Sequence, residues 1–321
     1  MKLKLTASLT LLASLAAGIV LATSPASPPA AGEVPAMKAR LATRAGLVAV
    51  SSAGETYVAV GDYGTIVRSS DGGNTWQQAA TVPVSGLLTS VSFADAKNGW
   101  AVGHGGIILV TRDGGETWAI QHTVDDKPVL LSVHFTDAEH GFVVGAYGTA
   151  LQTSDGGKNW EPMQVGEGRD ADLHLNHVFS GPSGTLFAAG ESGSAFRSKD
   201  GGLHWERLNT GATGSLWSGL QRKGGQVLLL GMSGKVLEST DLGDHWKSLE
   251  TGTNQALTGG VEKSDGGLVL VGTGGAIVTD KDGQLVTGIR DDRQNLAAVA
   301  SGGGNLILLG QNGLIKDSQT H

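Results

Sequence analysis

The chain has 321 residues, among them 51 glycines, 8 prolines and no cysteine. Glycine is present at about twice its ordinary share of roughly 7%, without the proline content of collagen or of proline-rich disordered tracts. The absence of cysteine excludes disulfides, thiolate metal sites, cysteine nucleophiles and a lipid-modified N-terminal cysteine. The formal charge of −7 argues against a nucleic-acid partner, because nucleic-acid binders carry a basic face.

The first 26 residues have the layout of a secretory signal peptide. A basic start, Met1-Lys2-Leu3-Lys4, precedes an uncharged, mostly apolar run over 5–22 and a small, proline-rich segment over 23–32. This order predicts a signal peptide over 1–26 and a linker over 27–36, and so an exported, periplasmic protein. Because 18 apolar residues just reach spanning length, an uncleaved anchor in the inner membrane is the alternative.

One pattern recurs seven times over residues 37–321. An apolar pair leads to a glycine, a two-residue turn and a second glycine, and then to an alternating strand and the box Ser/Thr-x-Asp-x-Gly-x-x-Trp. A period near 40 with only strand-like segments between turns is typical of β-propeller blades. The leading glycines, spaced 38–45 residues apart, are Gly61, Gly103, Gly145, Gly190, Gly231, Gly272 and Gly310.

Each copy of the repeat is predicted to form four short strands. In the second copy these strands lie near residues 88–93, 99–102, 107–111 and 117–121, and polar and apolar residues alternate in Ser90-Val91-Ser92-Phe93. After the leader, no stretch of the sequence combines helical periodicity with helix caps. The sequence therefore predicts an all-β fold, a single seven-bladed β-propeller over 37–321. An open solenoid, capped at both ends, is the structural alternative.

The last copy stops before its box, near Ser318. The segment from Val34 to Arg40 precedes the first predicted strand, and Met37 stands where a box Trp would stand. We therefore expect this N-terminal segment to complete the last blade, which would join the two ends of the propeller and leave no open sheet edge.

The boxes are predicted to be structural. The Asp carboxylate can accept hydrogen bonds from the amides of its own tight turn, and the Trp can fill the gap between neighbouring strands. A calcium ion needs six to eight oxygen ligands, whereas each box offers one carboxylate, so neither a metal nor another cofactor is expected. The five complete boxes supply the pairs Asp71 and Trp76, Asp113 and Trp118, Asp155 and Trp160, Asp200 and Trp205, and Asp241 and Trp246.

These boxes match the Asp-box (BNR) repeat from about residue 37 onward. A longer pattern, clearest over Ser90–Trp118 and Ser132–Trp160, places Ser-Val-x-Phe-x-Asp before the paired glycines and the box. On these residues the chain resembles the photosystem II assembly and stability factor family. The resemblance implies an exported, non-enzymatic seven-bladed propeller that binds a membrane-protein subunit during assembly. The basic Arg patch of the photosynthetic members has no counterpart, because the arginines here are scattered along an acidic chain.

Asp boxes also occur in sialidases, so a glycoside hydrolase or carbohydrate-binding propeller is the alternative function. A sialidase-like site needs an Arg cluster, a Tyr nucleophile and acidic partners. Tyr63 and Tyr147 occupy the same turn position in two copies of the repeat, which favours a scaffold role. The two Trp outside the boxes, Trp100 and Trp217, fall in predicted strands and are expected in the core. His174 and His177 are spaced so that a strand would point them to opposite faces, which disfavours metal chelation.

Charged residues gather in three of the links that join one predicted blade to the next. In a propeller, these links and the turns between second and third strands open on one face beside the axis. One interpretation is a simply solvated surface; the other is a docking face for a protein partner, expected to be an envelope membrane protein or complex. The candidate partner-binding residues are Asp125, Asp126, Arg169, Asp170, Asp172, Arg290, Asp291, Asp292 and Arg293.

Overall fold

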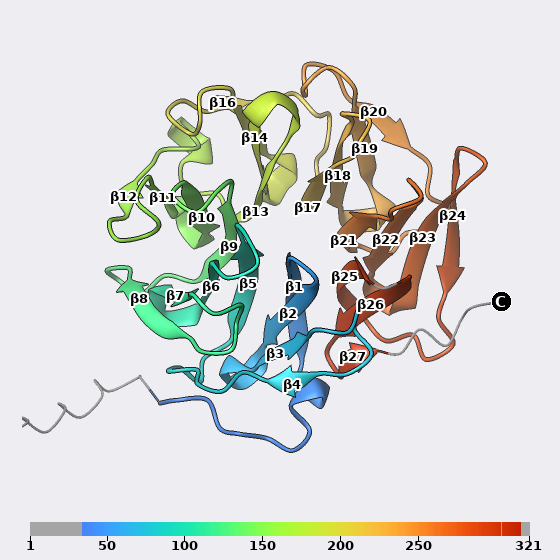
Figure 1. The fold of residues 1–321 in the computed structure, drawn as a ribbon. Coiled ribbons are helices and arrows are strands. Elements are labelled where there is room, and N and C mark those ends of the chain that lie inside the picture. Colours follow the sequence, from blue (N-terminus) through green and yellow to red (C-terminus); the bar gives the residue numbers. More distant parts are fainter. Residues whose placement is uncertain (1–33, 303, 316–321) are drawn as a thin grey trace, which may run out of the picture.

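The computed structural model describes residues 34–302 and 304–315, which form one ring of seven small β-sheets around a central axis (Figure 1). The sheets follow one another in chain order, and each blade packs between the blades before and after it. This arrangement confirms the predicted all-β, seven-bladed propeller. The predicted signal peptide over 1–26 lies outside the described residues, as do residues 27–33 of the predicted linker.

Within the described residues, blades 1–6 are four-stranded antiparallel sheets and blade 7 has three strands. Blades 1–3 consist of β1 (Leu47–Ala53), β2 (Thr56–Gly61), β3 (Ile66–Ser69) and β4 (Gln77–Gln78); β5 (Leu88–Phe93), β6 (Gly99–Gly103), β7 (Ile107–Thr111) and β8 (Ala119–Thr123); and β9 (Leu130–Phe135), β10 (Gly141–Gly145), β11 (Ala150–Thr153) and β12 (Glu161–Pro162). Blades 4–7 consist of β13 (Leu175–Ser180), β14 (Leu186–Gly190), β15 (Ala195–Ser198) and β16 (Glu206–Arg207); β17 (Leu216–Gln221), β18 (Val227–Gly231), β19 (Val236–Ser239) and β20 (Lys247–Leu249); β21 (Leu257–Glu262), β22 (Leu268–Gly272), β23 (Ala276–Lys281) and β24 (Gln284–Ile289); and β25 (Leu296–Gly302), β26 (Asn305–Gly310) and β27 (Gly313–Ile315).

The second strand of each blade forms the core. Every residue of β6, β10, β14, β18 and β22 is buried, since both faces of each sheet pack against a neighbouring blade. This burial explains why these strands are continuously apolar, as in Val227–Gly231, whereas the first strands alternate.

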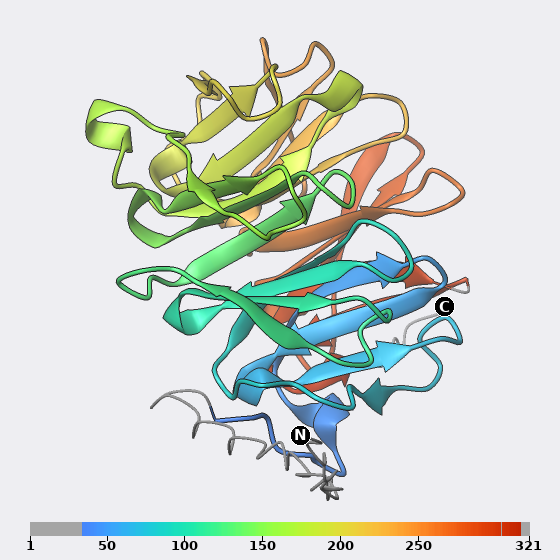
Figure 2. The ribbon, with the colours of Figure 1, turned by 60° about the vertical axis from the view of Figure 1, so that its left-hand side comes forward.

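The two ends of the strands define two faces of the ring (Figure 2). The link face carries the blade-to-blade links and the turns between second and third strands; the box face carries the remaining turns, including the Asp boxes. Backbone hydrogen bonds tie each link to a turn, as from Gly64 N to Gly86 O at 2.9 Å and from Gly148 N to Leu173 O at 3.0 Å. The turns are short 3-10 segments: η2 (Asp62–Gly64), η3 (His104–Gly106), η4 (Ala146–Gly148), η7 (Glu191–Gly193), η8 (Met232–Gly234) and η9 (Thr273–Gly275). Three further 3-10 segments lie elsewhere in the chain: η1 (Ala42–Arg44), η5 (Gly168–Asp170) and η6 (Pro182–Gly184).

Each Asp box is a self-contained hydrogen-bonded turn. In blade 2 the Asp113 carboxylate accepts bonds from the Thr117 amide at 2.9 Å and from the Thr117 and Thr111 hydroxyls. The Trp118 indole donates to the Gly115 carbonyl at 3.1 Å, and the side chain is buried. The boxes of blades 1, 4 and 5 repeat this pattern, whereas the indole nitrogen of Trp160 in blade 3 is buried with no hydrogen-bond partner.

The box also joins one blade to the previous one. Gly115 has a φ of +86°, and a Cβ added there would lie 3.0 Å from the Val58 side chain on β2. A side chain at Gly73 would similarly collide with Ile307 on β26, at 2.7 Å. The second box glycine is thus required both by its backbone conformation and by the close approach of the neighbouring blade.

Side chains of the inner strands connect adjacent blades around the axis. Ser90 and Ser132 accept hydrogen bonds from the amides of Val133 and Val178 in the next blade, both at 3.2 Å. His177 takes the place of these serines in blade 4, and its Nδ1 accepts from the Gly219 amide at 3.1 Å. These contacts satisfy backbone groups on the axial edge of strands that pair with a neighbour on only one side.

The N-terminal segment differs from its prediction. Residues 34–40 form no strand and do not pair with β27; they lie along blade 1, where Ala36 N donates to Val82 O at 3.0 Å and Ala39 N to the Gln78 side chain at 2.9 Å. Only η1 reaches blade 7, where it packs against β27. The expectation that residues 34–40 supply the fourth strand of blade 7 is therefore wrong for the described residues, because their backbone bonds are made to β4 and the segment after it.

We expect removal of a box side chain to lower stability. Trp118→Ala should reduce the free energy of unfolding by about 3–5 kcal/mol, because the buried indole leaves a cavity between two blades. Asp113→Ala should cost roughly 0.5–2 kcal/mol, since it removes the carboxylate that caps the Thr117 amide and hydroxyl, as loss of a helix cap does. Chemical denaturation followed by circular dichroism measures both.

Glu55→Ala is the matched control, because Glu55 is an exposed acid in a turn of blade 1. It should change stability by less than about 0.5 kcal/mol. A Trp118→Ala protein as stable as the parent would contradict a structural role for the boxes.

Stability should also fall in mild acid. Burial lowers the pKa of both His134 and His177 to about 4. The unfolded chain, with histidine pKa values near 6.5, therefore binds more protons than the folded protein between pH 6.5 and pH 4, so the melting temperature should decrease as pH falls through this range. The box carboxylates Asp71, Asp155, Asp200 and Asp241, whose hydrogen bonds lower their pKa values to about 2, should contribute only below about pH 3.8.

The sequence itself offers the control variants. Phe179 occupies the position of His134 in the next blade, and serine occupies that of His177 in blades 2 and 3. The double variant His134→Phe and His177→Ser should flatten the melting profile between pH 6.5 and 4. An unchanged slope would assign the acid sensitivity to other groups.

Candidate protein-binding face

The structure places all nine predicted partner-binding residues on links of the link face. Asp125 and Asp126 lie in the link from blade 2 to blade 3, and both are exposed. Residues 169–172 lie in the next link, from blade 3 to blade 4, and residues 290–293 in the link from blade 6 to blade 7. The first two links are neighbours, whereas the third lies across the ring (Figure 1). The predicted residues therefore form two separate groups.

Not all of these side chains are available to a partner. Arg290 is buried, with 6% of its surface exposed, and its guanidinium binds both carboxylate oxygens of Asp292, at 3.1 and 2.8 Å. Hydrogen bonds from Arg290 lower the pKa of Asp292. Asp170 forms an ion pair with Arg207. These pairs shape their links. The exposed charges in the two groups that belong to neither pair are Asp125, Asp126, Arg169, Asp172, Asp291 and Arg293.

Exposed apolar side chains on the same face were missed by the sequence analysis as binding candidates. Tyr63 and Tyr147 are 76% and 75% exposed, at turn positions with φ near +58° and +53°. Met232 is exposed at the start of the corresponding turn in blade 5. The repeated Gly-x-Tyr-Gly was the available signal, because that position is a glycine in blades 2 and 6, a serine in blades 4 and 5 and an asparagine in blade 7.

Trp217 is the second correction. The sequence analysis placed both non-box Trp in the core; Trp100 is fully buried and stacks on Phe135, but Trp217 is 41% exposed. The cause is a β-bulge: Leu216 pairs with Gly231 and Ser218 with Leu230, so Trp217 is the unpaired extra residue at the link-face end of the strand. Trp217 therefore lies beside the turn that carries Met232.

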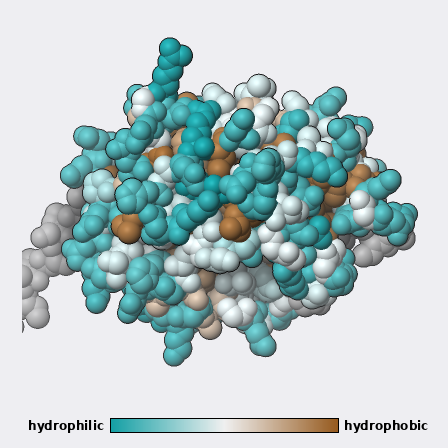
Figure 3. Space-filling view, turned by 90° about the horizontal axis from the view of Figure 1, so that it is seen from above, coloured by the Kyte–Doolittle hydropathy of each residue, from teal (hydrophilic) through white to brown (hydrophobic). Residues whose placement is uncertain are grey.

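The link face thus combines exposed aromatic residues with separate charged groups on a rigid ring. By contrast, the side of the ring in Figure 3 is mostly hydrophilic with small, separate hydrophobic spots. In the part of the chain that the structure describes, no group of three His, Asp or Glu side chains could hold a metal ion. Over the same residues, no helix has the length and apolar character needed to cross a membrane.

The ring of seven sheets, the Asp-box turns and the loop-built face together define an Asp-box β-propeller. Its sequence matches the family described as Photosynthesis system II assembly factor YCF48 over residues 42–121 and 120–284. Because this match spans well over half of the chain, the protein belongs to the YCF48 family. No curated protein sequence matched the chain.

Solved structures share the fold. The structure of YCF48 bound to D1 peptide has a TM-score of 0.70 at 22% sequence identity, and the alignment covers 88% of this chain and 97% of that one. YCF48 from Cyanidioschyzon merolae has a TM-score of 0.67 at 17% identity, with coverage of 84% and 94%. A streptogramin B lyase has a TM-score of 0.73 at 10% identity, with coverage of 85% and 93%. Since the last of these is named as an enzyme, the shared fold alone does not decide activity.

The two arginines of the link between blades 6 and 7 should respond differently to substitution. Arg290→Ala should lower stability by roughly 1–3 kcal/mol, because it removes a buried guanidinium and leaves Asp292 without its partner. Arg293→Ala, at an exposed position, should stay within about 0.5 kcal/mol of the parent. Thermal melting of the two variants compares them directly, and equal losses would contradict the structural role of Arg290.

Proposed function

We propose that this protein is an exported, non-catalytic propeller that binds a segment of a membrane protein through the link face. Its task is the assembly or maintenance of the complex to which that membrane protein belongs. The observation that carries the proposal is the family match over residues 42–284, because the matched family is one of assembly factors. A relative with the same fold is bound to a peptide, which supports a polypeptide as the partner.

The composition of the link face supports a protein partner. Tyr, Trp and Met are enriched at the centres of protein interfaces, where they bury much surface at low cost in side-chain entropy. Tyr63, Tyr147 and Met232 supply such residues in turns held by backbone hydrogen bonds, and Trp217 supplies one at the end of an inner strand. The surrounding charges, Asp125 and Asp126 on one side and Arg293 on the other, would orient the partner and suppress wrong ones.

The location follows from the N-terminal pattern. A basic start, an apolar run and a small-residue segment over 1–26 support export, and the periplasm is the proposed compartment. The proposed partner is accordingly an envelope membrane protein or complex. No cofactor is required for a platform of this kind, since binding needs only a preorganised surface.

The test uses the serine found at the tyrosine position in other blades. Ser192 and Ser233 have φ near +55°, so Tyr63→Ser and Tyr147→Ser should fold normally. In the source organism, a photo-crosslinking residue at Met232 should form an adduct with a membrane protein. The double Tyr→Ser variant should reduce this adduct at least fivefold, with an unchanged melting temperature.

A crosslinker at Leu203 is the control, because this residue is 69% exposed but lies in the box of blade 4, on the opposite face. Crosslinking to the same partner from Leu203 and not from Met232 would overturn the assignment of the link face. Turnover of a sialoside or another glycoside by the purified protein would overturn the non-catalytic proposal.

A further inference from the structure

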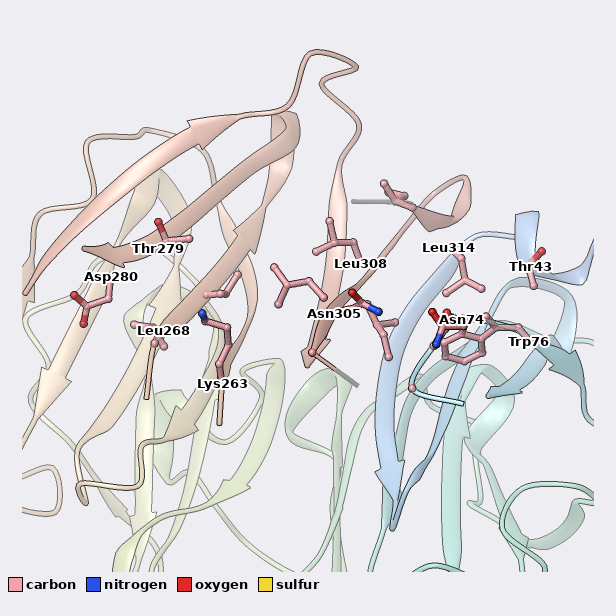
Figure 4. A pocket seen from close by; sticks show the side chains of 18 of the residues that line it. Thr43, Asn74, Trp76, Lys263, Leu268, Thr279, Asp280, Asn305, Leu308 and Leu314 are labelled. Atoms are coloured by element: carbon pink, nitrogen blue, oxygen red, sulfur yellow. Dashed lines mark hydrogen bonds between the residues drawn. The ribbon is translucent and has the colours of Figure 1, made fainter. Parts of the chain in front are cut away.

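A groove of about 1090 Å³ runs along the outer edge of blade 7, between blades 6 and 1. Figure 4 shows Asn305 and Leu308 between Leu268 and Thr279 on one side and Leu314 and Trp76 on the other. Within the described residues, β27 has no strand on its outer edge, whereas the third strand of every other blade pairs with a fourth. The groove therefore occupies the place of a fourth strand.

The backbone of β27 presents an acceptor that other blades use. In three complete blades, the carbonyl of the first residue of the third strand accepts a bond from the amide that directly follows the fourth strand, at 2.8–3.0 Å. These bonds run from Ala79 to Ile66, from Met163 to Ala150 and from Leu208 to Ala195. Leu314 holds the equivalent position in blade 7, because it pairs with the residue before the leading glycine, as Ile66 does in blade 1, and it lines the groove.

The shape of the groove selects its occupant. The outer strands of both neighbours, β24 and β4, extend beyond the edge of β27 by one strand position. That recess is about 4.8 Å deep, the spacing between paired strands. A single extended peptide fits it, whereas the folded surface of a second copy would meet the neighbouring blades before its own edge reached β27.

Blade 5 shows what side chain such a peptide needs. There Trp246 packs with Val227 and Leu229, in a cluster that also holds Phe187 of the previous blade. In blade 7, Leu306 and Leu308 take the places of Val227 and Leu229, because in each blade the two residues lie four and two positions before the leading glycine.

The previous blade supplies the other wall of this slot. Val269 of blade 6 corresponds to Phe187, since each lies three residues before the leading glycine of its turn, and Val269 lines the groove. The slot between Val269 and Leu308 is therefore bounded by apolar side chains, as the slot that holds Trp246 is. It suits a large apolar, preferably aromatic, side chain.

Charge also indicates the nature of the occupant. In blade 5, the Arg222 guanidinium donates to Gly266 O at 3.0 Å and lies 4.0 Å from the Asp280 carboxylate. Asp280 belongs to the incomplete box of blade 6, Asp280-Lys281-Asp282-Gly283, which lacks the Trp. Lys263 occupies the same position in blade 6, one residue after the inner strand, and lines the groove, where its ammonium binds the exposed Asp265 at 2.9 Å. An acidic residue that precedes the aromatic one, as in the boxes, would compete with Asp265 for this ammonium.

We propose that this groove binds an extended segment of a partner protein, which adds to β27 as the fourth strand of blade 7. The segment presents an acidic residue towards Lys263 and a large aromatic residue between Val269 and Leu308. Addition of a strand to an open edge is an established mode of peptide recognition. The site lies on the rim of the ring, apart from the link face, so neither proposal depends on the other.

The described N-terminal segment does not occupy this place, because residues 34–40 are bonded to blade 1.

The probe is a fluorescein-labelled peptide with the sequence of residues 239–250, which forms the box and fourth strand of blade 5. We expect it to bind the full chain in fluorescence anisotropy, and a peptide with Trp246→Ala to bind at least tenfold more weakly. Thr279→Trp, which fills the groove from β23, should also reduce binding at least tenfold. Glu238→Trp, the equivalent change in blade 5, should leave binding within twofold, and melting curves of both variants verify folding.

Four outcomes would overturn the proposal. Equal binding of the two peptides, or no effect of Thr279→Trp in a folded protein, would exclude the groove as the site. Binding that occurs only after deletion of residues 316–321 would assign the groove to the chain's own end. A dimer in light scattering that Thr279→Trp dissociates would assign it to a second copy. Loss of crosslinking at Met232 with intact peptide binding would affect only the proposed function of the link face.

Discussion

The contact between an Asp box and the second strand of the previous blade is the interaction on which the ring depends. A second strand such as β2 is buried on both faces, so it cannot be covered by its own blade alone. The box of the following blade brings a glycine with a left-handed backbone against it, and a Trp fills the remaining space. The box of each blade therefore covers the second strand of the previous blade, and stability is distributed over the interfaces between repeats.

This dependence explains which parts of the molecule could be predicted. Paired glycines, boxes and strand alternation recur at a near-constant spacing, and each has one physical reason, so the seven blades followed from the sequence. The turn that carries Tyr63 and the links that carry the charged residues were likewise assigned to the right face, because topology fixes which end of a strand a loop occupies.

Local features were harder to predict. Every blade has a bulge after the first residue of its inner strand, and Trp217 occupies that position in blade 5. Strand alternation in the sequence does not show where a bulge falls. Arg290 is buried because its link folds so that the guanidinium binds Asp292. A run of charged residues in the sequence does not indicate which side chains face water and which bind one another. Residues 34–40 lie along blade 1 and not along blade 7, and the repeat pattern does not indicate which of these blades they contact.

The blades on either side of the groove are joined near the axis by other side chains. Gly259, Ala298 and Ala49 stand in blades 6, 7 and 1 where Ser90, Ser132 and His177 stand in blades 2, 3 and 4. Here the Thr258 hydroxyl donates to Leu296 O at 2.8 Å between blades 6 and 7, and the Tyr57 hydroxyl donates to Ser301 O at 2.7 Å between blades 1 and 7. On the outside, the box of blade 1 packs against Ile307 of blade 7.

The open place in the ring is therefore the outer edge of blade 7 and not its axial contacts. A strand bound beside β27 would add backbone bonds to blade 7 and apolar contacts to the side chains of blades 6 and 1 that line the groove. Because such a ligand would contact three consecutive blades, part of its binding energy would be coupled to their packing against one another. This coupling gives a ligand at the rim a physical route to influence the rigidity of the link face.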